Sequence, residues 1–227
     1  MDKKIINKIL VLLGILLFSI CISNNAYAAD RHGAVKTETT EKKWTGISAD
    51  IVLPKTVNVV GSASYVDWYL GLGDAVIESG ISRTPQGYKV FLNSGEKEGG
   101  SQYWVSEYDP TIKDGDRVSL KLVNNNDGTV SLYVNNNPKA RYTQAIYKPS
   151  RLAPTDIVKM VQGVQDAGGS SFSQASFSNV LLRANASGTV YTPFDGKIPY
   201  KTTRVDVGGN DFTVFSHVPL STSLSAQ

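Results

Sequence analysis

The hydrophobic residues of this chain alternate with polar ones over short stretches, which is the period of β-strands. The clearest case spans residues 116–134, where apolar side chains fill every second position on both sides of an Asn126-Asp127-Gly128 turn. Asp-Gly favours tight hairpin turns because the central residues need positive φ. The apolar positions are Val118, Leu120, Leu122, Val130, Leu132 and Val134. Such a hairpin has one apolar and one polar face, so it covers a core from one side.

The same pattern continues along most of the chain. From Trp44 onward, runs rich in Val, Ile, Thr, Tyr and Trp are separated by clusters of Gly, Asn, Asp and Pro, which predicts about twelve strands. Residues 156–162 are the best helix candidate and fit a strand equally well. Many strands without crossover helices predict an all-β protein built as a two-sheet antiparallel sandwich.

The N-terminal segment has the features of an export signal. Lys3, Lys4 and Lys8 precede an uncharged apolar run over residues 9–22, and Ala26-Tyr27-Ala28 follows. This order is typical of a secretory signal peptide, and the run is shorter than the ~20 residues of a membrane anchor. We therefore expect residues 1–28 to be removed by cleavage after Ala28 or Ala29. The mature protein should be secreted, with the cell wall as one destination and no membrane contact.

The remaining chain divides by composition into three parts. Residues 29–43 are polar and predict a solvated lead-in, residues 44–218 a single sandwich domain, and residues 219–227 a disordered tail. Residues 189–218 are expected to add the last strands, because a segment of ~30 residues buries too little apolar area to fold alone.

Charge and cysteine content exclude several classes of function. The formal net charge is +3, and the N-terminal segment supplies most of it, which argues against a nucleic-acid partner. The one cysteine, Cys21, lies in the predicted signal peptide, so a disulfide framework and a multi-cysteine zinc site are excluded. No metal or other cofactor is expected. The loop at Asn124–Gly128 lacks an acid at the first calcium-ligand position, and a lone structural Ca²⁺ stays open.

Strand alternation selects a candidate ligand-binding surface. In residues 65–72, Asp67 and Tyr69 point away from the face that carries Trp68, and in residues 76–82 Glu78 does the same. Aromatic rings can stack on the apolar faces of sugar rings, and carboxylates can bind sugar hydroxyls. Core packing is the alternative role for each aromatic residue, and Trp68 and Phe91 are assigned to the core. The candidate ligand-binding residues are Asp67, Tyr69, Glu78, Tyr88 and Trp104.

Evidence for catalysis in the sequence is limited. Glycosidases need two carboxyl groups near one another, and no tandem acidic motif occurs on a strand. If the protein is a hydrolase, Glu78 would act with Gln102 or with Glu107. His32 and His217 lie near the two ends of the mature chain, and the G-x-S-x-G motif is absent. Whether the protein is an enzyme is left open.

Several short motifs resemble known families. Trp44-Thr-Gly-Ile, Trp68-Tyr-Leu-Gly-Leu-Gly, Glu78-Ser-Gly-Ile and Gly115-Asp-Arg-Val-Ser-Leu-Lys-Leu resemble the concanavalin A-like jelly-roll superfamily, and within it the YrpD-like group of small secreted bacterial proteins. This implies a lectin- or glucanase-type jelly-roll sandwich. The stretch is also similar to the eqolisin glutamic peptidases, whose catalytic Gln corresponds to Glu78. The family's catalytic Glu is expected near residues 88–91, where Lys89 and Val90 stand, so both catalytic positions differ.

These observations support three hypotheses of function. The first is a secreted, non-catalytic protein that binds a glycan or cell-wall polymer. The second is an extracellular hydrolase, either a glutamic-type peptidase or a glycoside hydrolase, that uses Glu78. The third is a structural or matrix protein without a small ligand. The sequence does not define the oligomeric state.

Overall fold

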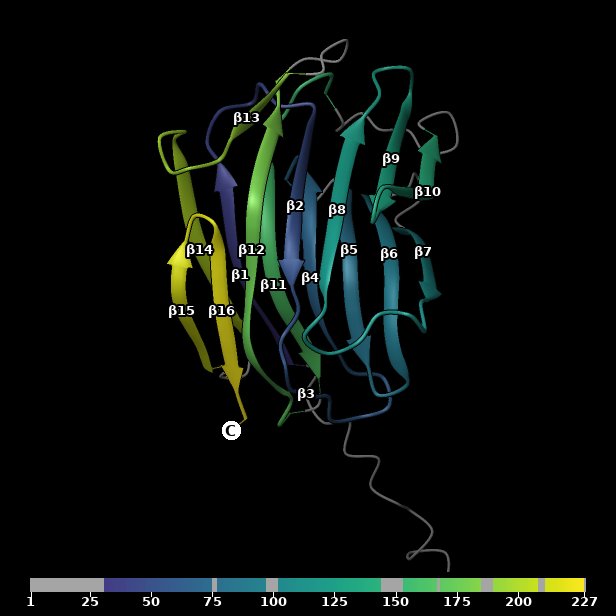
Figure 1. Cartoon of the computed structure of the whole chain (residues 1–227), viewed down its shortest axis with the longest axis vertical. Helices are drawn as coiled ribbons and strands as arrows, with labels where there is room; N and C mark the ends of the chain where they lie inside the picture. The colour runs from purple at the N-terminus through teal and green to yellow at the C-terminus, as the bar shows by residue number, and fades with distance from the viewer. Residues whose placement is uncertain are drawn as a thin grey trace, which may run out of the picture.

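The computed structural model shows an all-β sandwich of two antiparallel sheets (Figure 1). It describes residues 31–74, 77–96, 102–143, 153–166, 168–184, 190–207 and 211–226. The predicted signal peptide, residues 1–28, lies outside these ranges. The described ranges contain no helix, and therefore no apolar helix long enough to cross a membrane.

The first sheet has seven strands. In spatial order they are β14 (Tyr200–Val207), β1 (Arg31–Thr39), β11 (Val158–Asp166), β4 (Tyr65–Leu72), β5 (Ile77–Thr84), β6 (Gly87–Glu96) and β7 (Gln102–Tyr108). The strands β4 to β7 follow one another along the chain as hairpins, whereas β11, β1 and β14 come from distant parts of the sequence. This sheet carries the candidate site.

The second sheet has nine strands and lies in front of the first in Figure 1. Its main path is β10 (Asn137–Thr143), β9 (Thr129–Val134), β8 (Arg117–Asn124), β2 (Gly46–Val52), β12 (Ser171–Arg183), β16 (Leu220–Ser225) and β15 (Asp211–His217). Two short strands, β3 (Val57–Asn58) and β13 (Tyr191–Pro193), also pair with β12. The predicted hairpin at 116–134 is β8 and β9.

The core lies between the two sheets and is formed by alternate residues of nearly every strand. Trp68 of β4 is fully buried and meets the ring of Phe172 from β12 edge-on, with ring centroids 5.3 Å apart. Edge-to-face contact between aromatic rings adds to the stabilisation from buried apolar area. The antiparallel jelly-roll sandwich expected from the sequence is therefore confirmed.

Both ends of the expected sandwich domain need correction. Residues 31–39 form β1, which pairs with β11 on one side and β14 on the other, so a solvated lead-in over 29–43 is wrong there. Residues 220–225 form β16 with Leu220 and Leu224 buried, so most of the expected disordered tail is ordered. Residues 156–162 are not helical, and from Val158 onward they belong to strand β11.

Candidate functional site

The outer face of the seven-stranded sheet, which points away from the core, carries a cluster of polar side chains near its centre. The outer-face cluster comprises Asp67 and Tyr69 of β4, Glu78 of β5 and Lys159 of β11. Strand register brings them together: Gly71 of β4 pairs with Glu78 on one side and with Lys159 on the other. Asp67, Tyr69 and Glu78 therefore share one face, as the strand alternation indicates.

Glu78 and Lys159 form an ion pair that crosses β4. The Lys159 Nζ donates to Glu78 Oε1 at 2.6 Å, and the lysine side chain is only 3% exposed. Gly71 lies beneath this side chain, and a Cβ placed there would overlap Lys159 Cε. The missing side chain at Gly71 gives the lysine the room to reach Glu78.

Tyr69 is fixed by contacts on two sides. Its hydroxyl donates to Glu78 Oε1 at 3.3 Å, and its ring meets Phe91 of β6 edge-on at 5.8 Å between centroids. Tyr69 pairs with Gly80 of β5, where an added Cβ would overlap the Trp68 carbonyl oxygen and come within 2.6 Å of Tyr69 Cβ. Burial, together with the charge of Glu78, raises the pKa of Tyr69 well above its usual value of 10. Tyr69 is thus a neutral donor at any physiological pH.

Asp67 lies opposite Gly163 of β11 in the strand register. Its Oδ1 occupies the space that a Gly163 side chain would fill. This oxygen is shielded from solvent and has no hydrogen-bond partner among the residues that the structure describes. Burial, and to a lesser extent the charge of Glu78, raises the pKa of Asp67 to about 7. The nearby Gly163 backbone amide offsets part of this rise in pKa without satisfying Oδ1. Asp67 therefore changes charge near neutral pH.

A pocket of about 180 Å³ opens beside Asp67. Tyr65 and Tyr69 flank the aspartate on β4, and His32 of β1 and Gln165 of β11 complete the polar part of the lining. The Tyr65 hydroxyl donates to Gln165 Oε1 at 2.6 Å, so this ring is held in place by a strand neighbour. The pocket combines a carboxyl group with two tyrosines that are already positioned.

A second set of charges extends the cluster towards the sheet edge. Glu38 of β1 lies beside Lys159 in the register and is 2% exposed. It forms ion pairs with Lys201 at 2.8 Å and with Lys36 at 2.9 Å. Burial opposes ionisation, but these two lysines outweigh it and hold the pKa of Glu38 below its usual value. Positive and negative side chains thus alternate across β14, β1, β11 and β5.

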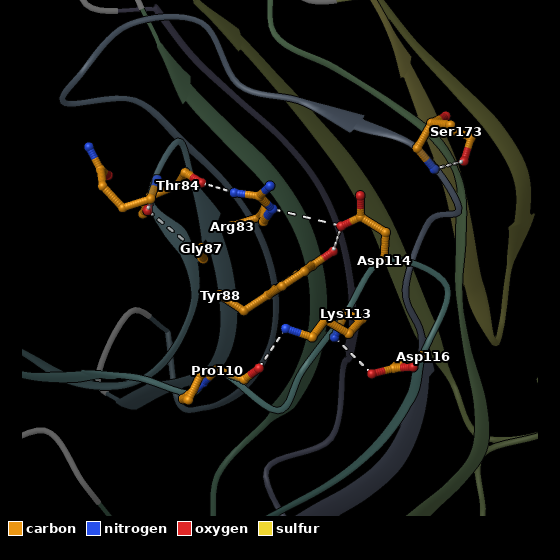
Figure 2. Close-up of polar contacts among 11 residues, drawn as sticks. Arg83, Thr84, Gly87, Tyr88, Pro110, Lys113, Asp114, Asp116 and Ser173 are labelled. Carbon is orange, nitrogen blue, oxygen red and sulfur yellow. Dashed lines mark hydrogen bonds and ion pairs between the residues drawn. The ribbon is translucent and has the colours of Figure 1, made fainter.

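Two candidates from the sequence do not belong to this site. Tyr88 is 4% exposed, packs beside Trp68 in the core and donates its hydroxyl to Asp114 at 2.7 Å (Figure 2). Its assignment to the outer face with Asp67 is therefore wrong. Glu107 pairs with the core residue Val90, so it belongs to the opposite face from Glu78 and cannot form a catalytic pair with it.

The remaining candidates are placed only in part. Trp104 pairs with Asn93 and Gln102 with Glu96 in the β6–β7 ladder, and the side chains of both Trp104 and Gln102 lie outside the described part of the structure. Glu78 pairs with Asn93, so Trp104 occupies the same row of the sheet as Glu78 and Gln102 a different one. Phe91, assigned to the core from the sequence, is buried as expected, but its ring packs against Tyr69 on the outer face and not in the cluster between the sheets.

Lys159 is the main member of the outer-face cluster that the sequence does not single out. It follows two apolar residues in a stretch that fits a helix or a strand, and only a strand places it on the outer face. A signal was present in Gly71, Gly80 and Gly163, because a glycine inside a strand often marks a close approach of another group. Gly71 makes room for Lys159 and Gly163 for Asp67, whereas Gly80 lies close to the β4 backbone at Trp68 and Tyr69.

The potential metal ligands of the protein are dispersed. Within the described ranges no group of three or more His, Cys, Asp or Glu side chains is arranged to hold a metal ion. In the Asn124–Gly128 loop, Asp127 Oδ1 accepts the Thr129 backbone amide at 2.9 Å. This carboxylate therefore stabilises the hairpin turn.

Comparison with known proteins supports the fold. No protein-family model and no curated protein matches the sequence. Among solved structures, a scytalido-glutamic peptidase bound to a transition state analog inhibitor aligns with a TM-score of 0.56 and 14% identity, over 87% of this chain and 98% of that one. SCP-B, a member of the eqolisin family of peptidases in complex with a tripeptide, aligns with a TM-score of 0.53 and 13% identity, over 88% and 99%.

A further solved structure, the carbohydrate-binding module CBM66 from Bacillus subtilis, aligns with a TM-score of 0.41 and 13% identity, over 65% of this chain and 80% of that one. A likeness at this level supports no inference about this chain. The two peptidase structures share the sandwich over nearly their whole length, and at such low identity they show the architecture alone. The described chain is thus a jelly-roll β-sandwich with a polar cluster on its seven-stranded sheet.

Proposed function

We propose that this protein is a secreted module that binds a glycan or cell-wall polymer on the outer face of its seven-stranded sheet. The observation that carries the proposal is Asp67, a partly buried carboxyl group that lines a pocket between Tyr65 and Tyr69. Pockets with a few convergent polar groups and a perturbed pKa are the usual place for a ligand.

The chemistry of the pocket fits a ligand rich in hydroxyl groups. A sugar hydroxyl can donate to Asp67 when the carboxyl is ionised and accept from it when it is protonated. Both flanking tyrosines are held by neighbours, Tyr65 by Gln165 at 2.6 Å and Tyr69 by Glu78 at 3.3 Å. Rings that are fixed before the ligand arrives lose little entropy on binding.

The ion pair between Glu78 and Lys159 supports binding over peptidase chemistry at Glu78. The negative charge of a carboxylate 2.6 Å from a buried ammonium is already balanced. A general base needs a lone pair of its own that can reach the proton it removes. Glu78 then serves to position Tyr69 and Lys159.

Hydrolysis is a second candidate function, with Asp67 rather than Glu78 as the catalytic carboxyl group. A carboxyl group whose pKa is raised to about 7 can act as a general acid or base near neutral pH. This candidate predicts slow turnover of a polysaccharide or protein that is lost in Asp67→Asn and retained in part in Glu78→Gln.

The proposal is tested by titration calorimetry of the mature protein against soluble plant and bacterial glycans, with purified cell wall assayed by co-sedimentation. Binding by wild type that falls about tenfold or more in Asp67→Ala supports the proposal. Asp211→Ala, an exposed aspartate on the other sheet, is the matched control. Absence of binding across the panel, or equal binding by both variants, would contradict it. Release of sugars or peptides in the same samples would favour the hydrolase.

A further inference from the structure

A second cavity lies at one end of the sandwich, where the β5–β6 turn meets the β7–β8 connection (Figure 2). Its volume is about 500 Å³, and it shares no lining residue with the pocket beside Asp67. Cavities of roughly 300–1,000 Å³ are typical of small-ligand sites. This end cavity is lined by Arg83, Tyr88, Tyr108, Lys113 and Asp114, among others.

Arg83 brings uncommitted hydrogen-bond donors to the end cavity. Its Nη1 donates to the carbonyl of Thr84, and its Nε lies 3.7 Å from Asp114 Oδ1, beyond hydrogen-bond distance. Within the described ranges Nε has no hydrogen-bond partner, and the arginine side chain remains 23% exposed. A guanidinium has five N–H donors. Nε is shielded from solvent, so the donors open to a ligand are those on the exposed part of the group.

Asp114 brings a free acceptor next to these donors. Its Oδ1 accepts the Tyr88 hydroxyl at 2.7 Å, which fixes the carboxylate. No hydrogen bond to Oδ2 from the described residues is found, and the side chain is 36% exposed. Figure 2 shows the Arg83 Nε and the Tyr88 hydroxyl both directed at the same oxygen of Asp114. The Arg83 guanidinium also lies over the Tyr88 ring at 5.4 Å, which sets its position.

Tyr108 provides an aromatic surface at the same cavity. It is 47% exposed, which is high for a tyrosine, and it lines the cavity beside the β5–β6 turn. Its hydroxyl donates to Gln86 Oε1 at 3.4 Å, and the Lys89 ammonium lies 4.6 Å from the ring centroid. These contacts hold the ring while leaving nearly half of the residue accessible.

The charges of the cavity lining balance one another. Arg83 and Lys113 are cationic, and Asp109 and Asp114 are anionic. Lys113 Nζ already donates to the carbonyl of Pro110 at 2.7 Å, and Asp109 accepts Lys139 at 3.5 Å. A lining without net charge does not favour an ionic ligand. Adjacent free donors and acceptors instead match a vicinal diol, in which each hydroxyl both donates and accepts.

We propose that the end cavity is a second saccharide site, which takes an uncharged oligosaccharide by stacking one sugar on Tyr108 and binding its vicinal hydroxyls between Arg83 and Asp114. The site does not depend on Asp67 or on the outer-face cluster. A ligand long enough to occupy both sites would bind with higher avidity than either site alone.

The proposal is tested by amide chemical shifts of the isotope-labelled mature protein. The probes are the tetrasaccharides of cellulose, xylan and chitin, with tetragalacturonate as the charged comparison. We expect at least one neutral tetrasaccharide to shift the amides of Gly87, Asp109 and Asp114. We expect Tyr108→Ala to weaken that binding by about tenfold or more. Tyr133→Ala is the matched control, because Tyr133 also carries a lysine over its ring, Lys121 at 4.2 Å.

The outcomes separate the two sites. Shifts confined to residues 65–69 would reject the end cavity and leave the outer-face proposal intact, and shifts confined to the end cavity would do the reverse. Binding at the end cavity by tetragalacturonate alone, or unchanged affinity in Tyr108→Ala, would overturn the assignment of an uncharged sugar stacked on this ring. No shift at the end cavity with any probe would overturn the site itself.

Discussion

Lys159 lies across Gly71 and reaches Glu78 on the next strand but one, with 2.6 Å between Nζ and Oε1. The pair joins β11 and β5 across β4. The lysine is 3% exposed, so this carboxylate and the nearby Glu38, rather than water, balance its ammonium group. Removing one partner of a buried ion pair leaves an uncompensated charge, which is more costly than removing both.

We therefore expect Glu78→Gln to lower the free energy of unfolding by roughly 2 kcal/mol, below the range for fully buried pairs because Glu78 is 23% exposed. The double variant Glu78→Gln/Lys159→Met should recover part of the loss. Urea denaturation of wild type, both single variants and the double variant measures this. Strictly additive losses would show that the two side chains do not interact.

The glycine beneath the lysine gives a second prediction. In Gly71→Ala the new methyl group would overlap Lys159 Cε and come within 2.7 Å of Lys159 Cγ. The lysine must move, so the ion pair should lengthen and stability should fall by about 1–3 kcal/mol. Combining Gly71→Ala with Lys159→Ala should remove most of that cost. If the alanine is equally harmful in both backgrounds, the clash is with the backbone and not with the lysine.

Stability should fall as pH rises from about 4 to about 7. The pKa of Asp67 is about 7 in the folded protein, against an ordinary value of 3.8 for an aspartate. The folded state therefore binds the proton of Asp67 more tightly than the unfolded state does. The stabilisation that this provides is complete below the unfolded-state pKa and is lost as pH rises through the folded-state pKa. The difference between the two pKa values corresponds to a change in the free energy of unfolding of roughly 4 kcal/mol at most. Asp67→Asn should be close to wild type in stability at about pH 4 and more stable at about pH 8.

Thermal or urea unfolding of wild type and Asp67→Asn across this pH range measures the effect. Glu107→Gln, which changes an exposed carboxylate on the opposite face, serves as the control and should follow wild type. Parallel curves for wild type and Asp67→Asn would show that Asp67 ionises normally.

Export can be tested at the N-terminus. If residues 1–28 form a signal peptide, the protein collected outside the cell should begin at Ala29 or Asp30. Edman sequencing or intact-mass measurement of the secreted fraction determines this. A product that retains Met1 and sediments with membranes would contradict both the cleavage and the secreted location.

The central strands could be predicted from the sequence because their apolar residues alternate over five or more positions. In residues 65–72 the pattern places Trp68 inside and Asp67 and Tyr69 outside, as the structure has them. Tyr88 shares its face with Val90 and Leu92, so the same alternation could have assigned it to the core. Its aromatic ring instead suggested a role in stacking on a sugar.

The edges of the domain were harder to predict because their strands carry few apolar residues. In β1 only Val35 is a large buried hydrophobic residue, and its neighbours Thr37 and Thr39 are buried through polar contacts. Lys36 and Glu38 look solvated in the sequence but pair with each other in the structure. Lys159 depends on a register between strands that are distant in the chain, which no local pattern encodes.

The most direct test of the account is the affinity of the mature protein for its tightest-binding glycan, measured by calorimetry before and after the single change Asp67→Ala. We predict saturable binding by wild type and a loss of about tenfold or more in the variant, while Asp211→Ala keeps the wild-type affinity. Binding that is the same in all three proteins, or that is absent in wild type, would contradict the claim that Asp67 and its two tyrosines form a ligand site.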